Sequence, residues 1–442
     1  MTQAVILAGG KGTRLAGRLN GKPKPMVDVD GVPLLQRQID ALVKQGVDDI
    51  VILVNHAADQ IEAFVASLEL PITITLIDDG EPRGTAGATL ACLDRLQDRF
   101  FVAYGDTLFD LDIRHMLEVH AASGADATLL LHPNDHPADS DLVEVNDAGF
   151  IRAFHPYPHP GGAWLRNLVN AAFYVAERDA LMPWANRMTV GDFAKDLFPA
   201  MVAEGAKLKG HVTFEYIKDI GTPARLDKAV GHLRRGTVAR ARRDTLQRAV
   251  FVDRDGTLNA LAGHIARAED LNLIEGAAAA VKRLNDAEFR VVLVTNQPVL
   301  ARGELDAAGL ARIHARLETE LGHAGAYLDA IYYCPHHPHA GYPGEVAELK
   351  RSCTCRKPAT GMVQAAVQDL NIDLQRSWMI GDSTADVAMA NAAGLRAILV
   401  ATGEGGRDGK YDAEADATSD SFSQAVDLIL GAQQSHQRTI VA

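Results

Sequence analysis

Short apolar runs alternate with amphipathic helices along the whole chain. In the first half, residues 33–45 place their apolar side chains on one helical stripe, and an apolar run over 50–54 follows. In the second half, a helical pattern over 277–284 precedes an apolar run over 291–294. This alternation predicts a doubly wound α/β fold, with mostly parallel sheets, helices on both faces, and functional groups at the carboxyl ends of strands.

A glycine-rich loop follows the first apolar run, Ala4–Leu7, and reads Ala8-Gly9-Gly10-Lys11-Gly12-Thr13-Arg14. Its glycines let main-chain N–H groups approach phosphates closely, and Lys11 and Arg14 add positive charge. The loop is not a Walker loop, because Gly12 stands where Ser or Thr is required. It is not the dinucleotide fingerprint either, because Leu15 stands at the third glycine. It predicts a nucleoside triphosphate site.

Further motifs extend this pattern. Lys22-Pro23-Lys24-Pro25-Met26 follows the loop, Arg83-Gly84-Thr85-Ala86-Gly87 adds a second glycine segment, and Asp106 and Asp219 follow apolar runs. Together they resemble the sugar-1-phosphate nucleotidylyltransferases. The resemblance implies a Rossmann-like (glycosyltransferase-A-like) domain with Arg14 and Lys24 as catalytic residues and Mg²⁺ on Asp106 and Asp219, since Mg²⁺ takes few protein oxygens and keeps positions open for phosphate. It implies nucleotide contacts from Leu7, Gly9, Gly10, Gly12, Thr13, Gly84, Thr85 and Asp106.

The sequence departs from this family on the acceptor side. Relatives carry Glu-Lys-Pro where this chain reads Ala153-Phe154-His155-Pro156, so the lysine expected on the sugar phosphate is missing. His155 and Arg166 are both candidates to replace it. Downstream, Asn170-Ala171-Ala172 resembles the family's Asn-Ala-Gly sugar-binding strand with its glycine lost, so Asn170 is expected to contact the sugar.

A second set of motifs begins at the apolar run Ala249–Val252, which ends in Asp253-Arg254-Asp255-Gly256-Thr257. Two acids two residues apart point the same way in an extended segment. This motif resembles the first motif of the haloacid-dehalogenase phosphatases, and the later motifs follow in order. The resemblance implies that Asp253 is the nucleophile, that Asp255 protonates the leaving alcohol, and that Asp253, Asp382 and the carbonyl of Asp255 hold Mg²⁺. It places phosphate or substrate on Thr295, Asn296, Gln297, Arg302, Arg356 and Lys357.

Three of the four cysteines fall in one window, as Cys334-Pro335-His336-His337 and, after a loop, Cys353-Thr354-Cys355. Three thiolates and one imidazole form a donor set typical of a closed tetrahedral zinc site. A disulfide is disfavoured, because we expect no signal peptide and therefore a reducing cytosol. Either His336 or His337 could complete the site; the family pattern favours His336. We expect Cys92 to be an inert core residue on a helix over 85–96.

The cysteine window narrows the phosphatase resemblance. Cys-Pro-His and Cys-x-Cys-Arg-Lys-Pro occur in the capless branch that holds the D-glycero-D-manno-heptose 1,7-bisphosphate 7-phosphatases and the histidinol-phosphate phosphatases. The long stretch over 337–352 and Gly361-Met362 resemble the heptose enzymes. The family's usual Thr-Asn-Gln-Ser-Gly reads Thr295-Asn296-Gln297-Pro298-Val299 here, which puts the substrate-side contacts in question.

Composition fits two cytoplasmic enzymes in one chain. The 442 residues are 47% hydrophobic and 23% charged, and no apolar run approaches the ~20 residues of a membrane span. A net charge of −13 argues against nucleic acid as a partner. The segment 233–248 is the basic exception, and its six arginines predict a solvated helix end and linker, with a nucleic-acid arm as the alternative.

We therefore expect four parts: a nucleotidylyltransferase domain over 1–235, a basic linker over 236–247, a phosphatase domain with a zinc loop over 248–432, and a polar tail over 433–442. A phosphatase acting on a heptose 1,7-bisphosphate leaves a sugar 1-phosphate, which is the acceptor class of the other domain. The prediction is a bifunctional enzyme of nucleotide-activated heptose synthesis that uses sugar phosphates and GTP, with a monomer and a homo-oligomer both left open as the assembly state. Alternatives are a hexose-1-phosphate transferase fused to another sugar phosphatase, and a regulatory binding protein with decayed sites.

Overall fold

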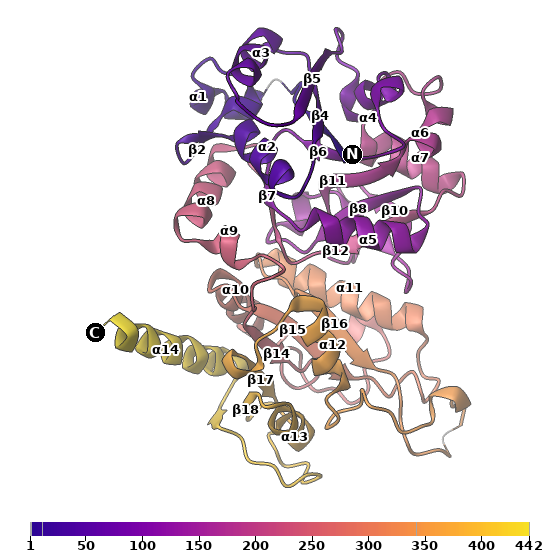
Figure 1. The fold of residues 1–442 in the computed structure, drawn as a ribbon. Coiled ribbons are helices and arrows are strands. Elements are labelled where there is room, and N and C mark those ends of the chain that lie inside the picture. The colour runs from indigo at the N-terminus through magenta and orange to yellow at the C-terminus, as the bar shows by residue number, and fades with distance from the viewer. Residues whose placement is uncertain (1, 11, 342, 442) are drawn as a thin grey trace. The chain divides into compact units, whose positions relative to one another are not determined.

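The computed structural model describes residues 2–10, 12–341 and 343–441, so Lys11 of the glycine loop lies outside the described residues. The chain divides into two units (Figure 1). The first comprises Met1–His132, Ser140–Tyr157 and Leu168–Arg243, and the second comprises Pro133–Asp139, Pro158–Asn167 and Asp244–Ala442. The chain therefore enters the second unit twice before Asp244.

The first unit is built on a mixed sheet. Its central path runs β10-β9-β11-β6-β1-β4-β5, with β8 on β11 and β12 on β8. The pairs β6–β1, β1–β4 and β4–β5 are parallel, whereas β11 runs antiparallel to β6 and β8. The strands are β1 (Gln3–Leu7), β4 (Asp49–Val54), β5 (Thr73–Asp78), β6 (Arg99–Tyr104), β8 (Ala127–His132), β9 (Leu142–Val145), β10 (Ile151–His155), β11 (Val169–Glu177) and β12 (Leu208–Val212).

Alternating side chains of these strands fill two separate cores. Ala4 and Ile6 of β1 pack on one face with Leu35 and Ile39 of α2 (Leu34–Lys44), while Val5 packs on the other face with residues such as Phe198 of α7 (Phe198–Ala203). The period-two alternation of a strand explains this division. The other helices of the unit are α1 (Ala16–Leu19), α3 (Ala58–Ala66), α4 (Gly84–Leu90), α5 (Ile113–Ser123), α6 (Arg178–Leu181), α8 (Pro223–Arg234) and α9 (Thr237–Arg240).

One local prediction for this unit needs adjustment. α4 ends at Leu90, so Cys92 follows the helix and does not lie on it, although it is buried as expected. In the basic segment, Arg234 pairs with Asp30 at 2.8 Å and Arg242 with Asp110 at 2.7 Å. These arginines are therefore engaged with carboxylates of their own unit.

The second unit is a parallel sheet with strand order β16-β15-β14-β17-β18-β19 (Figure 1). The strands are β14 (Ala249–Val252), β15 (Arg290–Asn296), β16 (Ala330–Cys334), β17 (Trp378–Gly381), β18 (Arg396–Val400) and β19 (Ala417–Ser419). The helices are α10 (Ala277–Asp286), α11 (Ala307–His323), α12 (Gly361–Leu370), α13 (Thr384–Ala393) and α14 (Phe422–Val441). The parallel order places β14, β15 and β17 side by side, so their carboxyl ends meet. The predicted α/β class is confirmed for both units.

The segment Pro158–Asn167 packs on α11 within the second unit. Arg166 forms an ion pair with Glu318, whose side chain is only 4% exposed. The Thr319 hydroxyl oxygen accepts from the N–H of Leu165 at 3.1 Å. Trp164 lies beneath the guanidinium of Arg316, 5.1 Å from the ring centre. These contacts fix three consecutive residues along one helix.

Candidate active sites

The glycine loop of the first unit packs against Lys24. β1 ends at Leu7, and Gly12 adopts a φ of +62°, which side chains other than glycine rarely take. A Cβ on Gly12 would lie only 2.9 Å from the Cβ of Lys24. Glycine is therefore required both by its backbone conformation and by this close contact. The result is that Lys24 lies beside the loop.

Asp106 and Asp219 are brought together by a two-stranded ribbon. β7 (Thr107–Asp110) begins directly after Asp106, and β13 (Tyr216–Asp219) pairs antiparallel with it, so that Asp219 lies opposite Thr107. The N–H of Ile220 also donates to the carbonyl of Asp106 at 2.9 Å. Lys24 Nζ lies 2.5 Å from Asp106 Oδ2. The two predicted carboxylates and the predicted lysine thus form one cluster.

Two arginines complete this cluster. A Cβ built on Gly221 would lie 3.5 Å from Arg14 Nη2 and 3.8 Å from Lys24 Nζ, which places both cations beside the turn after Asp219. Arg225, in the first turn of α8, donates from Nη1 to Asp219 Oδ1 at 2.8 Å. The sequence analysis missed Arg225. The sequence did contain a signal for it, because Arg225 follows Asp219 by six residues and lies in the first turn of the next helix.

The second glycine segment, residues 83–87, packs against Gly191 of the same unit. Gly191 O accepts from the N–H of Ala86 at 2.9 Å, and a Cβ on Gly84 would collide with that same oxygen. The Thr85 hydroxyl donates to Asp192 Oδ2 at 2.7 Å. The close approach that Gly84 permits is therefore to residue 191 of the same unit, and the Thr85 hydroxyl is already engaged within the protein.

The acceptor side contains a strained alanine. Ala172 adopts a φ of +57° where the pairing of β11 with β8 is irregular, and its N–H donates to Asn170 Oδ1 at 3.2 Å. This is the position where the resembling family carries glycine. Of the two candidates for the missing lysine, Arg166 belongs to the second unit and pairs with Glu318, while His155 lies 3.4 Å from Glu144.

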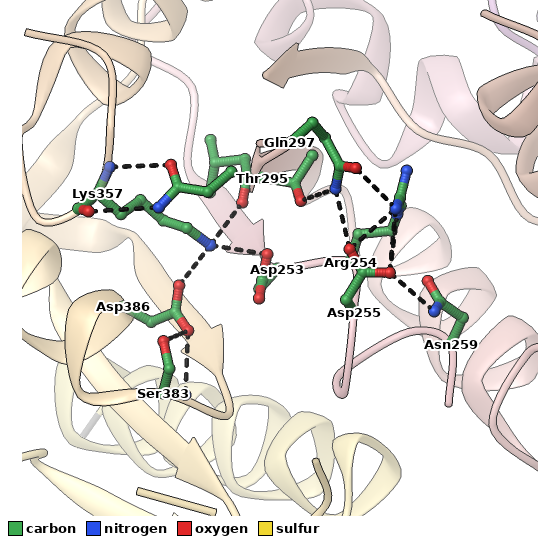
Figure 2. A network of polar contacts seen from close by, with 11 residues as sticks. Asp253, Arg254, Asp255, Asn259, Thr295, Gln297, Lys357, Ser383 and Asp386 are labelled. Atoms are coloured by element: carbon green, nitrogen blue, oxygen red, sulfur yellow. Dashed lines mark hydrogen bonds and ion pairs between the residues drawn. The ribbon is translucent and has the colours of Figure 1, made fainter. Parts of the chain in front are cut away.

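In the second unit, Lys357 links two buried carboxylates (Figure 2). Its Nζ lies 2.7 Å from Asp253 Oδ1 and 2.6 Å from Asp386 Oδ1, and it donates to the carbonyl of Val294 at 3.1 Å. Burial alone would lower the pKa of Lys357, but the two carboxylates outweigh it and raise that pKa. Lys357 is therefore a permanent cation beside the predicted nucleophile.

Asp253, Asp382 and Asp386 each offer an oxygen within 4.8 Å of the others. Burial raises the pKa of Asp253, and the neighbouring carboxylates add to this despite Lys357. Burial likewise raises the pKa of Asp382 to about 6. Asp386 is engaged by Lys357 and by the capping box with Ser383 at the start of α13. Lys357 pairs with both Asp253 and Asp386, and the ionised forms of the three carboxylates together call for a further cation.

Asp255 is surrounded by hydrogen-bond donors (Figure 2). Arg254 Nη2 lies 2.9 Å from Asp255 Oδ2, Gln297 Nε2 donates to the same oxygen at 2.9 Å, and Asn259 Nδ2 donates to Oδ1 at 3.1 Å. Burial alone would raise the pKa of Asp255, but Arg254 and these donors lower it. The carboxylate is held firmly in one orientation.

The predicted Thr295-Asn296-Gln297 motif serves partly to hold other site residues. Gln297 donates from Nε2 to the Thr295 hydroxyl oxygen at 2.9 Å as well as to Asp255. Asn296 Oδ1 accepts from the N–H of Lys357 at 3.0 Å, and its Nδ2 donates to the Lys357 carbonyl at 3.3 Å. The Asn296 amide thus fixes Lys357, which the sequence analysis had not foreseen.

The four predicted thiol and imidazole ligands converge. Cys334 Sγ lies 3.5 Å from Cys353 Sγ and 3.2 Å from Cys355 Sγ, and His336 Nδ1 lies 3.3 Å from Cys355 Sγ. All four cysteines are free thiols. His337 instead directs Nδ1 to the carbonyl of His339 at 3.2 Å. The geometry thus places His336 in the group, and a donor set of three thiols and one imidazole fits zinc.

Arg302 and Arg356, the two remaining predicted substrate cations, each contact a histidine of the second unit. Arg302 Nη1 lies 3.2 Å from His264 Nδ1, and Arg356 Nη1 donates to the carbonyl of His336 at 3.1 Å. Arg356 thereby joins the cysteine group to the loop that carries Lys357.

Comparison with known families agrees with this two-site arrangement. A model described as nucleotidyl transferase matches residues 3–235, and a model described as haloacid-dehalogenase hydrolase-like matches residues 354–425. The chain belongs to the nucleotidyl transferase family through its first half and carries a haloacid-dehalogenase-like phosphatase in its second. It is an enzyme with a transferase and a phosphatase part.

Curated relatives match the phosphatase part. The chain is 42% identical over 160 residues to the D-glycero-beta-D-manno-heptose-1,7-bisphosphate 7-phosphatase of Haemophilus ducreyi, covering 36% of this chain and 85% of that protein. It is 44% identical over 188 residues to the D-glycero-D-manno-heptose-1,7-bisphosphate 7-phosphatase of Thermosynechococcus vestitus, covering 41% of this chain and 94% of that protein. Among solved structures, HddC from Yersinia pseudotuberculosis is 27% identical with a TM-score of 0.46, over 53% of this chain and all of that one.

The described residues contain no helix that is long and apolar enough to cross a membrane.

Proposed function

We propose that the chain is a bifunctional cytoplasmic enzyme of nucleotide-activated heptose synthesis. The part over 248–432 removes the 7-phosphate of D-glycero-D-manno-heptose 1,7-bisphosphate. The part over 1–235 transfers a nucleotidyl group, with GTP as the donor, to the resulting heptose 1-phosphate and releases pyrophosphate. The observation that carries the proposal is the joining, in one chain, of a nucleotidyl transferase to a phosphatase whose relatives are named for heptose bisphosphate.

In the phosphatase, Asp253 attacks the phosphorus of the 7-phosphate and the P–O bond to the sugar breaks. The electron pair stays on the sugar oxygen, which takes a proton from Asp255. Water then attacks the phosphorus of the aspartyl phosphate and gives a proton to Asp255, the bond between Asp253 and phosphorus breaks, and inorganic phosphate leaves. Lys357, 2.7 Å from Asp253, neutralises charge on the transferring group, and we assign the Thr295 hydroxyl to the same phosphate.

Mg²⁺ fits the Asp253 and Asp382 carboxylates, with the Asp255 carbonyl as a further ligand. It would neutralise the phosphate charge that these buried acids otherwise oppose. We assign Arg302 and Arg356 to the remainder of the substrate, as the resemblance to the haloacid-dehalogenase phosphatases implies.

In the transferase, an oxygen of the sugar 1-phosphate attacks the α-phosphorus of the nucleoside triphosphate, and pyrophosphate leaves. Arg14 and Lys24 neutralise the triphosphate, and the main chain from Leu7 to Thr13 cradles it, including Gly9, Gly10 and Gly12. Asp106 and Asp219 would hold Mg²⁺ there. Gly84 and Thr85 frame the base, and Asn170 contacts the sugar.

Zinc on Cys334, His336, Cys353 and Cys355 completes the proposal. Because these four donors leave no open position, its role is structural. It would hold the loop from Cys334 to Cys355, and through Arg356 the neighbouring Lys357, in place.

The alternative keeps both reactions and changes the sugar, as a hexose-1-phosphate transferase joined to a phosphatase of the histidinol-phosphate type or another sugar-phosphate specificity. Incubation of the full chain with a panel of sugar bisphosphates and the four nucleoside triphosphates, read by mass spectrometry, distinguishes the two. A GDP-heptose product supports the proposal. A nucleotide-hexose product, with no heptose consumed, selects the alternative.

A further inference from the structure

Arg254 lies between the two acids of the phosphatase motif and is completely buried, with 0% exposure. β14 ends at Val252, and Arg254 lies in a bend between the two acids. From this bend its guanidinium reaches Asp255. Nη2 lies 2.9 Å from Oδ2 and 3.1 Å from Oδ1, and Nε lies 3.2 Å from Oδ1.

Gln297 closes this contact into a ring. Its Oε1 accepts from Arg254 Nη2 at 3.0 Å, while its Nε2 donates to Asp255 Oδ2 at 2.9 Å (Figure 2). Both oxygens of Asp255 are therefore held, and Arg254 is the charged member that touches each of them. The carboxyl group cannot turn about its side-chain bonds without breaking several hydrogen bonds at once.

Stability of the fold does not explain this arrangement. Arg254 Nη1 is buried and has no hydrogen-bond partner among the described residues. Burying a guanidinium with an unsatisfied donor is costly, and a buried ion pair rarely stabilises a fold more than apolar side chains of the same volume. A function for the contact accounts for it better.

We propose that Arg254 is a positioning residue that holds the carboxyl group of Asp255 in line with the leaving oxygen of the phosphate ester. The inference rests on the proposed phosphatase function. As the P–O bond breaks, protonated Asp255 gives its proton to the alcohol oxygen and becomes the carboxylate that Arg254 and Gln297 hold, and such a transfer needs the acid within hydrogen-bond reach of that oxygen. A carboxyl group freed from Arg254 would lose this alignment, while attack by Asp253 would be unchanged.

Two phosphate esters that differ in their leaving group separate loss of proton donation from loss of nucleophilic attack. In the full chain, kcat/KM is compared for the heptose bisphosphate, an alkyl ester, and for p-nitrophenyl phosphate, whose phenolate departs without a proton. General acid catalysis is worth ~10²–10⁴-fold, so Arg254→Met should lower kcat/KM for the alkyl ester by about 10²-fold or more and for the aryl ester by less than about tenfold. Arg254→Lys keeps the charge without the planar guanidinium, so its kcat/KM for the alkyl ester should lie between those of the wild type and Arg254→Met. Retained aryl ester turnover shows that the variants are folded.

A double-mutant comparison provides the second readout. In an Asp255→Asn background, Arg254→Met should cause little further loss on the alkyl ester, because the group that it positions has gone. Equal losses on both esters in the Met and Lys variants, or losses that add fully in the Asp255→Asn background, would overturn the positioning role. A wild-type chain that cleaved neither ester would overturn the phosphatase function itself, and the positioning role with it.

Discussion

Arg166 forms an ion pair with Glu318 although 152 residues separate them along the chain. Glu318 lies on α11, and its side chain is only 4% exposed. Burial raises the pKa of Glu318 and the charge of Arg166 opposes that shift. The pair therefore ties the segment Pro158–Asn167 to the second unit.

Arg166→Met should leave the Glu318 carboxylate buried without its cation. Removing one partner of such a pair costs about 3–5 kcal/mol, so the urea midpoint at which phosphatase activity is lost should fall markedly. The double variant Arg166→Met, Glu318→Leu should recover most of the loss, because no charge remains buried. An unchanged midpoint in the single variant would show that the pair does not stabilise the second unit.

Ala172→Gly should stabilise the first unit. Alanine in the left-handed region costs about 1–2 kcal/mol, and glycine removes this strain. The greater entropy of the unfolded chain with glycine offsets part of that gain. We expect a net gain of up to ~1 kcal/mol in the free energy of unfolding. Ala171→Gly is the matched control, since Ala171 is buried beside it without a positive φ, and it should destabilise. A loss of stability in both variants would contradict the strain at Ala172.

His211 should make the first unit acid-sensitive. Burial lowers the pKa of His211 from 6.5 to about 4. The neighbouring His115, Arg243 and Lys209 add to this shift, and Asp112 opposes it. The unfolded chain then takes up a proton between pH 6.5 and 4 that the folded unit does not, so stability falls as the pH drops through that range. The full contribution is roughly 3 kcal/mol. Urea unfolding of wild type and His211→Phe at pH 7 and pH 5 tests this. The variant should show a flatter pH dependence, and identical slopes would refute the assignment.

The cysteine group should bind zinc. The purified chain is expected to carry about one zinc per molecule by metal analysis. Cys353→Ala should lose the metal and weaken the phosphatase while nucleotidyl transfer continues. Cys92→Ala should keep the metal, since Cys92 lies in the core of the first unit. Protein purified without chelators and free of zinc would rule the site out.

Much of both sites follows from the sequence because the residues sit where apolar strands end. Asp253 follows β14, and Asp382 follows β17, which pairs with β14, so parallel pairing alone brings them together. Cys334 and Cys353 likewise belong to short motifs whose donor chemistry is readable locally. In each case the strand pattern and the residue type, together with the resemblance to known families, carried the prediction.

The rest depends on contacts between distant parts of the chain. The pairing of Arg166 with Glu318, and the membership of Pro158–Asn167 in the second unit, leave no periodic trace in the sequence. The contact of Arg254 with Asp255 forms in a bend after β14 ends, where strand alternation no longer predicts the direction of a side chain. The closure of Gly84 by Gly191 shows a further limit, because a glycine motif reveals a close approach but not which group makes it.

The central claim is that one chain carries out two consecutive reactions on a heptose. The direct measurement follows products over time from heptose 1,7-bisphosphate, GTP and Mg²⁺ with the full chain. Inorganic phosphate should appear before pyrophosphate and GDP-heptose, because an uncleaved 7-phosphate brings roughly two extra negative charges to an acceptor site that lacks the usual lysine. Asp253→Asn should block the sequence from the bisphosphate but convert heptose 1-phosphate normally, and Asp106→Ala should stop at heptose 1-phosphate. Formation of a nucleotide sugar from the bisphosphate by Asp253→Asn at the wild-type rate would contradict the account.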